Sequence, residues 1–272
     1  AFDGTYIYAT SKGAGADNLK LAKYNLSSVQ VAENATAAHD GTNMNQVNGI
    51  DIHDGKLYVS STNYPTTPAV SYIKVFNCSD LSYVEEHQVL NYWSEGASYH
   101  DGSWWVVYHN YKYVSKYNAS WVWQADYELT FVQTGGDQGY QGITWYGDLI
   151  FVNIHELQGP QLCDVYRWNG SGFDEVIRLP RLEAQDSQGV YWDGSNLWWA
   201  ERKYPDAAQN RVCRTTIDWA SPPGYANCKG LWKMNEALWT PDQAGNVVDS
   251  SGQGNHGTPK GSVATDASGK IG

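Results

Sequence analysis

Four polar residues occupy equivalent places in four similar phrases of the sequence, each directly before a glycine: Asn48, Glu95, Gln141 and Gln188. If their side chains face a common space, they can bind a sugar, a cation or a cluster of water molecules. One carboxylate among three amides is a weak set for calcium, which prefers more carboxylate oxygens, and no metal is expected. The simpler alternative is a polar channel lining that holds only water.

Two carboxylates, Asp51 and Glu95, are weak candidates for catalysis. Glycoside hydrolysis requires two carboxyl groups at a set separation. The equivalents of Asp51 in the other phrases are Ser98, Thr144 and Tyr191, so its carboxylate does not recur. The sequence contains neither a Gly-x-Ser-x-Gly motif nor a phosphate-binding loop before a helix. An enzyme is therefore the less favoured interpretation, and no cofactor is expected.

The phrases that carry these residues recur with a regular period. Their glycines, at positions 49, 96, 142 and 189, are 47, 46 and 47 residues apart. An Asp-Gly pair follows three of these glycines, with Gly147-Asp148 as a variant after Gly142, and a further copy of the pair stands at Asp3-Gly4. A fixed period in this range indicates a repeat architecture, in which each repeat is one supersecondary unit.

One period contains four short strands. In the fourth repeat they read "GITWYG", "LIFVNIHE", "CDVYRWN" and "FDEVIRLP", and turn residues separate them. Four antiparallel strands in about 47 residues make a propeller blade. We therefore expect an all-β fold, a five-bladed β-propeller over residues 1–222, with blades near 1–48, 49–95, 96–141, 142–188 and 189–222. Blade 1 lacks an innermost strand in this scheme.

The propeller model also explains two further patterns, the adjacent apolar residues within strands and the rings before the turns. Runs such as "WWVVY" are apolar on both faces, as expected for strands buried between blades. Flat rings, including His53 and His100, precede the Asp-Gly turns. His109 and His155 end second strands, and we expect them to be loop-facing and solvated.

Three tyrosines each follow a second strand: Tyr64, Tyr111 and Tyr204. They should project from one mouth of the propeller, where tyrosine rings can contact a glycan or a protein. Packing within the loops is the structural alternative.

Residues 223–272 have no copy upstream. The stretches "GLWKMNE", "VVDSSGQGNHGT" and "GKIG" resemble the start of the laminin-G-like (concanavalin-like) jelly-roll module found in secreted proteins. The resemblance implies a partial β-sandwich, because about 50 residues are too few for the whole module.

Asparagine sequons and cysteines indicate the compartment. Asn-x-Ser/Thr occurs at five positions, Asn25, Asn34, Asn77, Asn118 and Asn169, which predicts N-glycosylation and a secretory route. A strand-end turn that favours Asn before Ser explains part of this excess. Four cysteines fit two disulfides. Cys213 with Cys228 is the preferred pair, which leaves Cys78 with Cys163, although sequence alone does not fix the connectivity.

Charge and hydropathy restrict the partners. The formal net charge is -11 among 272 residues, so nucleic acid and anionic membrane surfaces are not expected partners. The sequence contains no run of 18 apolar residues, so it predicts no membrane-spanning helix. The first residue, Ala1, fits a processed N-terminus.

These observations favour a secreted or cell-surface glycoprotein with a structural, adhesive or assembly role, such as a subunit of a surface layer or filament. Its expected partners are other copies of itself or other extracellular proteins. A lectin-like module that binds glycans is the alternative, and a propeller glycosidase is the second alternative.

Overall fold

The computed structural model describes residues 1–10, 19–109, 111–131, 139–155, 161–180, 186–202 and 211–216. The chain divides into two compact units, Ala1–Thr216 and Ile217–Gly272. The second unit, and with it the laminin-G-like interpretation, lies outside the described residues. Within the described part of the chain, no helix combines the length and apolar character needed to cross a membrane.

Eighteen strands form five antiparallel sheets in the described residues. Blade 1 contains β1 (Tyr6–Thr10), β2 (Leu21–Asn25) and β3 (Gln30–Asn34). Blade 2 contains β4 (Gln46–His53), β5 (Lys56–Thr62), β6 (Ser71–Asn77) and β7 (Tyr83–Gln88). Blade 3 contains β8 (Ser94–His100), β9 (Ser103–Tyr108), β10 (Tyr113–Asn118) and β11 (Trp123–Glu128). Blade 4 contains β12 (Gly139–Tyr146), β13 (Leu149–His155), β14 (Gln161–Trp168) and β15 (Phe173–Pro180). Blade 5 contains β16 (Asp186–Trp192), β17 (Asn196–Arg202) and β18 (Arg211–Thr216).

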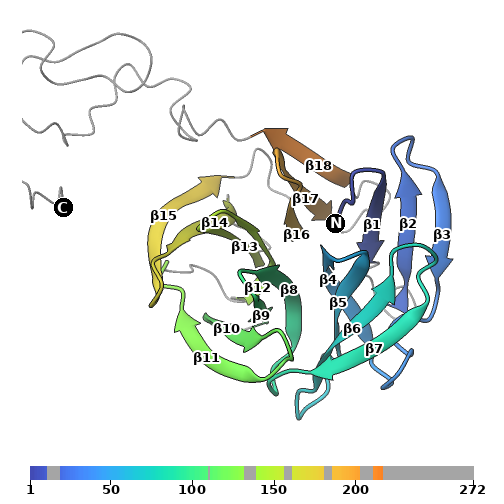
Figure 1. Ribbon diagram of the computed structural model, residues 1–272, viewed down its shortest axis with the longest axis horizontal. Helices are drawn as coiled ribbons and strands as arrows, with labels where there is room; N and C mark the ends of the chain where they lie inside the picture. The colour runs from blue at the N-terminus through green and yellow to red at the C-terminus, as the bar shows by residue number, and fades with distance from the viewer. Residues whose placement is uncertain are drawn as a thin grey trace, which may run out of the picture. The chain divides into compact units, whose positions relative to one another are not determined.

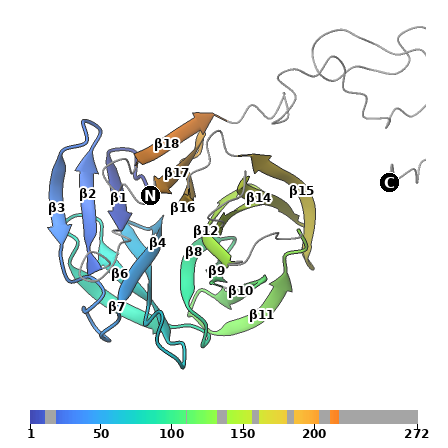
Figure 2. The same ribbon diagram turned by 180° about the vertical axis from the view of Figure 1, so that it is seen from behind.

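The five sheets are arranged around a central axis, with β4, β8, β12 and β16 innermost (Figures 1 and 2). This confirms the predicted five-bladed β-propeller. Blades 2, 3 and 4 have four strands, and blades 1 and 5 have three in the described residues. Among the described residues, the innermost place of blade 1 holds a bridge between Phe2 and Ile7 and no full strand.

The hairpins between the first and second strands follow from their Asp-Gly pairs. Asp54 and Gly55 have φ of 49° and 71°, and Asp101 and Gly102 have 46° and 72°. Two successive positive φ angles are typical of the type I′ turn that suits a twisted hairpin. These two turns, the Gly147-Asp148 turn of blade 4 and the Asp193-Gly194 turn of blade 5 all lie between a first and a second strand, at the same end of their blades, which we call the turn face. The loops 63–70 and 89–93 lie at the opposite end, the loop face.

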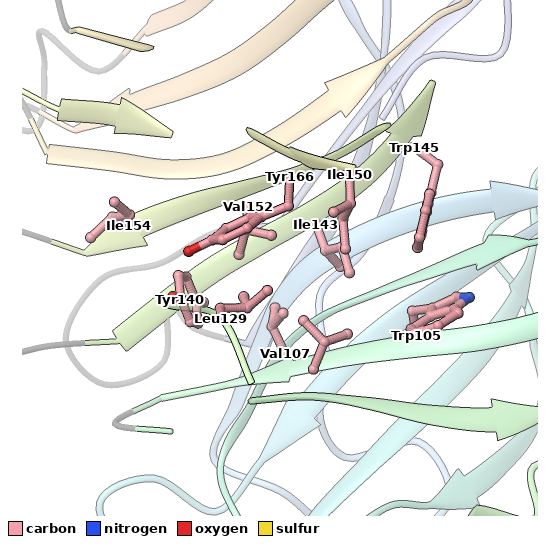
Figure 3. Close-up of a cluster of buried hydrophobic side chains, with 11 residues drawn as sticks. Trp105, Val107, Leu129, Tyr140, Ile143, Trp145, Ile150, Val152, Ile154 and Tyr166 are labelled. Carbon is pink, nitrogen blue, oxygen red and sulfur yellow. The ribbon is translucent and has the colours of Figure 1, made fainter. Parts of the chain in front are cut away.

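The core consists of layers packed between neighbouring blades. Trp104 is 4.0 Å (ring centroids) from Tyr58 of blade 2, whereas Trp105 is 5.2 Å from Trp145 of blade 4. Figure 3 shows the layer between blades 3 and 4, in which Trp105 of blade 3 lies beside Trp145 of blade 4. The prediction that the "WW" pair is buried on both faces is confirmed. Each buried indole contributes about 4–6 kcal/mol of transfer free energy.

The repeat glycines are explained by the close approach of the innermost strands. A Cβ on Gly49 would lie 3.0 Å from the Cα of Gly96, and one on Gly96 would lie 3.1 Å from the Cα of Gly142. A Cβ on Gly142 would lie 3.0 Å from the Cα of Gly189. Backbone atoms cannot move aside as a flexible side chain can. Only glycine therefore allows the blades to meet at the axis.

Candidate binding site in the central channel

A β-bulge interrupts each innermost strand next to its repeat glycine. The register with the second strand skips Glu95 in β8, Gln141 in β12 and Gln188 in β16, and it shifts between Val47 and Ile50 in β4. Bulges redirect a side chain and are frequent beside functional sites. We call Asn48, Glu95, Gln141 and Gln188 the channel ring; the side chain of Gln188 is outside the described set.

The other three side chains of the channel ring are buried, with 1–4% of their surface exposed. The Asn48 amide donates from Nδ2 to the carbonyl oxygen of Ser94, 3.0 Å away, which links blade 2 to blade 3. In the described part of the chain, Asn48 Oδ1 and Gln141 Oε1 accept no hydrogen bond. Buried acceptors of this kind are satisfied by water or by a ligand that donates hydrogen bonds.

Glu95 lies beside His109, with 3.7 Å between Oε1 and Nδ1. The expectation that His109 is solvated is wrong, because only 7% of this residue is exposed. The rings of Tyr64 and Trp93 pack around it, at centroid distances of 5.3 and 6.2 Å. The loop after β5 holds Trp93 in place, since Asn63 Oδ1 accepts from the indole Nε1 at 3.2 Å. His155 belongs to β13, but its side chain is not described.

Two of the predicted mouth tyrosines lie on the loop face, in separate clusters. Tyr64 packs against Trp93, at a centroid distance of 4.9 Å. Tyr111 stacks on Tyr92 at 4.1 Å and donates its hydroxyl to Asp126 Oδ2 at 3.1 Å. Both therefore pack within their loops, which is the structural alternative. Tyr204 lies outside the described residues.

Asp51 connects two blades. Its Oδ2 accepts the backbone N–H of Tyr99 at 2.9 Å, and in blade 4 the hydroxyl of Thr144 accepts the equivalent N–H of Trp192 at 3.0 Å. Burial raises the pKa of Asp51 to about 6. Since a neutral hydroxyl performs the same task, the contact accounts for Asp51 without a catalytic role.

The flat rings before the Asp-Gly turns stack on the next blade. His53 lies 3.8 Å from Tyr99, and His100 lies 4.1 Å from Trp145 with an interplanar angle of 7°. Tyr146 of blade 4 lies 4.6 Å from Trp192 of blade 5. The sequence indicated a flat ring at this repeated position, and the structure adds that the ring contacts the next blade.

The glycine contacts stop at blade 5. A Cβ on Gly189 would meet no described atom within 4 Å. The adjoining cavity, about 120 Å³, holds several times the volume of one water. It borders β1, Gly189 and Trp198. We call this space the empty place of the channel. The lack of an innermost strand in blade 1 was the sequence signal for an open place in the ring, but it did not identify the residues that border the cavity.

The sequons lie at strand ends. Asn25 ends β2, Asn77 ends β6 and Asn118 ends β10, and Asn169 follows β14. All four are on the turn face, because they lie beside the Asp-Gly or Gly-Asp turns. Asn34 ends β3 at the opposite end of blade 1, where it is opposite Leu21.

The predicted disulfide between Cys78 and Cys163 is not formed. Both are free thiols. Cys163 is fully buried in β14, whereas Cys78 follows β6 and its carbonyl accepts the hydroxyl of Tyr8 at 3.1 Å. This pair was predicted only because the other two cysteines had been paired first, and the sequence did not show that Cys78 and Cys163 belong to different blades. The partner expected for Cys213, Cys228, lies outside the described residues. In those residues, no group of three or more His, Cys, Asp and Glu side chains could hold a metal ion.

No family model matches the chain, and no curated protein matches it. Solved structures do match. A calcium-binding protein, regucalcin, from Agrobacterium tumefaciens is 12% identical, with 79% of this chain and 72% of that chain covered and a TM-score of 0.51. The WD40 repeats of RRP9 are 12% identical, with 79% and 77% covered and a TM-score of 0.48. The computationally designed Ika4 protein is 7% identical, with 66% and 95% covered and a TM-score of 0.38. The likeness to regucalcin concerns the fold alone.

Proposed function

We propose that this protein is an extracellular structural or assembly protein, and that a strand of a second copy completes its propeller at the empty place. The observation that carries the proposal is the interruption of the glycine contacts at Gly189, where the described residues leave open space. Strand addition to a sheet edge is a common mode of protein association, because main-chain hydrogen bonds supply affinity.

The inner edge of β1 offers such hydrogen bonds. Tyr8 exchanges two backbone hydrogen bonds with Ala1, at 2.8 and 2.9 Å. Since alternate residues of an antiparallel strand face the same neighbour, the backbone of Thr10 points the same way. No described strand pairs with Thr10 on that side. An incoming strand would extend the short pairing at Ala1.

A second copy can supply a suitable strand. Residues 217–272 contain nine glycines, and the glycine contacts in the other blades require that residue at the axis. An extended chain spans about 3.3–3.6 Å per residue, so part of this segment is long enough to reach a neighbouring molecule. The sequons and the resemblance to a laminin-G-like module support the extracellular location.

Light scattering coupled to size-exclusion chromatography tests the proposal on the full chain. We expect wild type to have the mass of more than one copy, and Gly189→Val to be monomeric because its side chain fills the empty place. Gly172→Val is the matched control, since a Cβ there also meets no described atom within 4 Å and the residue lies in an outer turn of blade 4. It should assemble as wild type does. A monomeric wild type overturns the proposal, as does assembly that Gly189→Val leaves unchanged.

Carbohydrate binding is a second candidate function, favoured by one pair of rings on the loop face. Tyr92 is 41% exposed and stacks on Tyr111, and the Asp126 carboxylate lies at the Tyr111 hydroxyl. An exposed ring beside a carboxylate suits the apolar face and the hydroxyl groups of a sugar. A glycan array with wild type and Tyr92→Ala tests this. Binding that survives the substitution, or no binding by wild type, rejects this surface.

A further inference from the structure

We propose that N-linked glycans attach preferentially at Asn25, Asn118 and Asn169, which gives the propeller one glycan-bearing face and leaves the loop face bare. The five sequons have the same sequence motif, but they differ in how the folded chain uses their amide groups. Glycan attachment forms a bond to Nδ2, so the hydrogen bonds of that nitrogen decide the order of preference.

In the three preferred sequons the fold uses only the amide oxygen. Asn25 Oδ1 accepts the backbone N–H groups of Ser27 and Val29 at 3.0 and 2.9 Å. Asn118 Oδ1 accepts those of Ser120 and Val122 at the same distances. Asn169 Oδ1 likewise accepts backbone N–H groups of its own turn. Such turns hold the side chain by its oxygen, and Nδ2 has no recorded hydrogen bond to the described residues.

The other two sequons use the nitrogen. Asn34 donates from Nδ2 to Asp40 Oδ2 at 2.7 Å and to the carbonyl oxygen of Leu81 at 3.2 Å. The first is a charge-assisted bond, about twice as strong as a neutral one. Asn77 donates from Nδ2 to the hydroxyl of Ser82 at 2.9 Å. A glycan takes the place of one of the two hydrogens on Nδ2. At Asn34, where both hydrogens are used, a glycan therefore breaks a hydrogen bond, whereas at Asn77 it must either take the hydrogen that does not bind Ser82 or break that bond.

The serine of the sequon supplies a second argument. In blades 1 and 3 the turn uses the backbone N–H of Ser27 and of Ser120, whereas neither hydroxyl has a recorded hydrogen bond to the described residues. The turn therefore explains the asparagine but not the hydroxyl two residues later. A glycosylating enzyme requires that hydroxyl.

The chemistry is a transfer from a lipid-linked oligosaccharide diphosphate. A bond forms between Nδ2 and the anomeric carbon of the first sugar, and the bond from that carbon to the donor phosphate breaks. The lipid diphosphate leaves with the bonding electrons, and Nδ2 loses one proton. The amide oxygen keeps its lone pairs and therefore its turn hydrogen bonds.

The blade topology places these glycans together. Asn25 lies opposite Tyr6, and Asn118 lies opposite Ser103, so both are next to Asp-Gly turns. Asn169 follows Trp168, whose N–H donates to the carbonyl of Asp148 in the Gly-Asp turn of blade 4. The loop face, with Tyr92 and Tyr111, remains accessible to a partner.

Glycopeptide mass spectrometry of the full chain, secreted by a eukaryotic host cell, measures the occupancy of each sequon. We expect Asn25, Asn118 and Asn169 to be more fully occupied than Asn77 and Asn34. Equal occupancy at all five overturns the inference, and so do a reversed order or the absence of glycans. Because it does not depend on strand addition, a monomeric protein leaves it intact.

Matched variants separate glycan loss from loss of the turn. Ser27→Ala should remove the glycan at Asn25 without changing the thermal midpoint of the enzymatically deglycosylated chain, and Ser27→Thr should retain the glycan. Asn118→Asp keeps an oxygen that can accept the turn hydrogen bonds and should lose one glycan mass. Asp40→Ala should raise occupancy at Asn34, since it removes the charged one of the two acceptors of Nδ2 and leaves only the carbonyl of Leu81. Unchanged occupancy at Asn34 contradicts the argument from hydrogen bonding.

Discussion

The glycine contacts at the axis allow a prediction in which one added methyl group has opposite effects at two equivalent positions. In Gly142→Ala the new Cβ would lie 2.9 Å from the backbone nitrogen of Val190 and 3.0 Å from the Cα of Gly189. Both neighbours are backbone atoms of β16, so β12 and β16 must separate. Overpacking of this kind typically costs about 1–3 kcal/mol.

The matched variant is Gly189→Ala. This glycine occupies the same position in blade 5, and its Cβ would meet no described atom within 4 Å. Its φ is outside the positive range, so alanine introduces no backbone strain. Reduced entropy of the unfolded chain then favours the variant by about 0.4–1 kcal/mol.

Thermal and urea unfolding, followed by tryptophan fluorescence, measure the difference. For a domain of this size, 1 kcal/mol shifts the midpoint by about 2–4 °C. We therefore expect Gly142→Ala to melt about 2–12 °C below wild type, and Gly189→Ala to melt at or slightly above it. The measurement requires monomeric protein, because an added strand would contact Gly189. Equal destabilisation of the two monomeric variants would refute the glycine contacts as described.

Three further predictions concern buried groups. Burial raises the pKa of Asp51 from its ordinary value of 3.8 to about 6. Because the folded chain binds this proton more tightly than the unfolded chain does, the protonated carboxyl adds about 3 kcal/mol to the free energy of unfolding. That contribution is fully present below about pH 4 and is lost as pH rises through about 6. Asp51→Ser should reduce that loss in urea unfolding at pH 4 and pH 8, and an unchanged difference contradicts the assignment. Lys74 is fully buried and donates to three backbone carbonyls of the segment between blades 1 and 2; Lys74→Met should lower the free energy of unfolding by about 3 kcal/mol or more, and a smaller effect in urea titration argues against these contacts. Burial raises the pKa of the Cys163 thiol well above its ordinary range, so alkylation measured by mass spectrometry should require unfolding, and rapid labelling of the native chain contradicts this burial.

Much of the fold could be predicted because the repeated positions hold residues with strong conformational preferences for turns or strands. The Asp-Gly pairs specify hairpins, and paired tryptophans specify strands buried on both faces. The polar residue before each glycine was recognisable as a repeated position, and the structure shows that Asn48, Glu95 and Gln141 are buried there. The bulge that aims it was not predictable, since a register slip of one residue depends on both strands.

Other features depend on contacts distant in sequence. The burial of His109 requires the loop that carries Tyr64 to fold over it. Cys78 and Cys163 are separated because they belong to blades 2 and 4, and the number and spacing of cysteines do not reveal this. The separate tyrosine clusters arise because Trp93 and Tyr92, adjacent in sequence, pack against different partners.

The bulges at the channel ring have an evolutionary consequence. At Glu95, Gln141 and Gln188 the bulged residue has no opposite residue in the ladder, so its identity is largely independent of strand pairing. A mutation there changes the charge or hydrogen bonding of the axis while the hairpin keeps its register. Duplicated blades can therefore diverge one side chain at a time at this level, and the same scaffold can acquire different channel linings without a change of architecture.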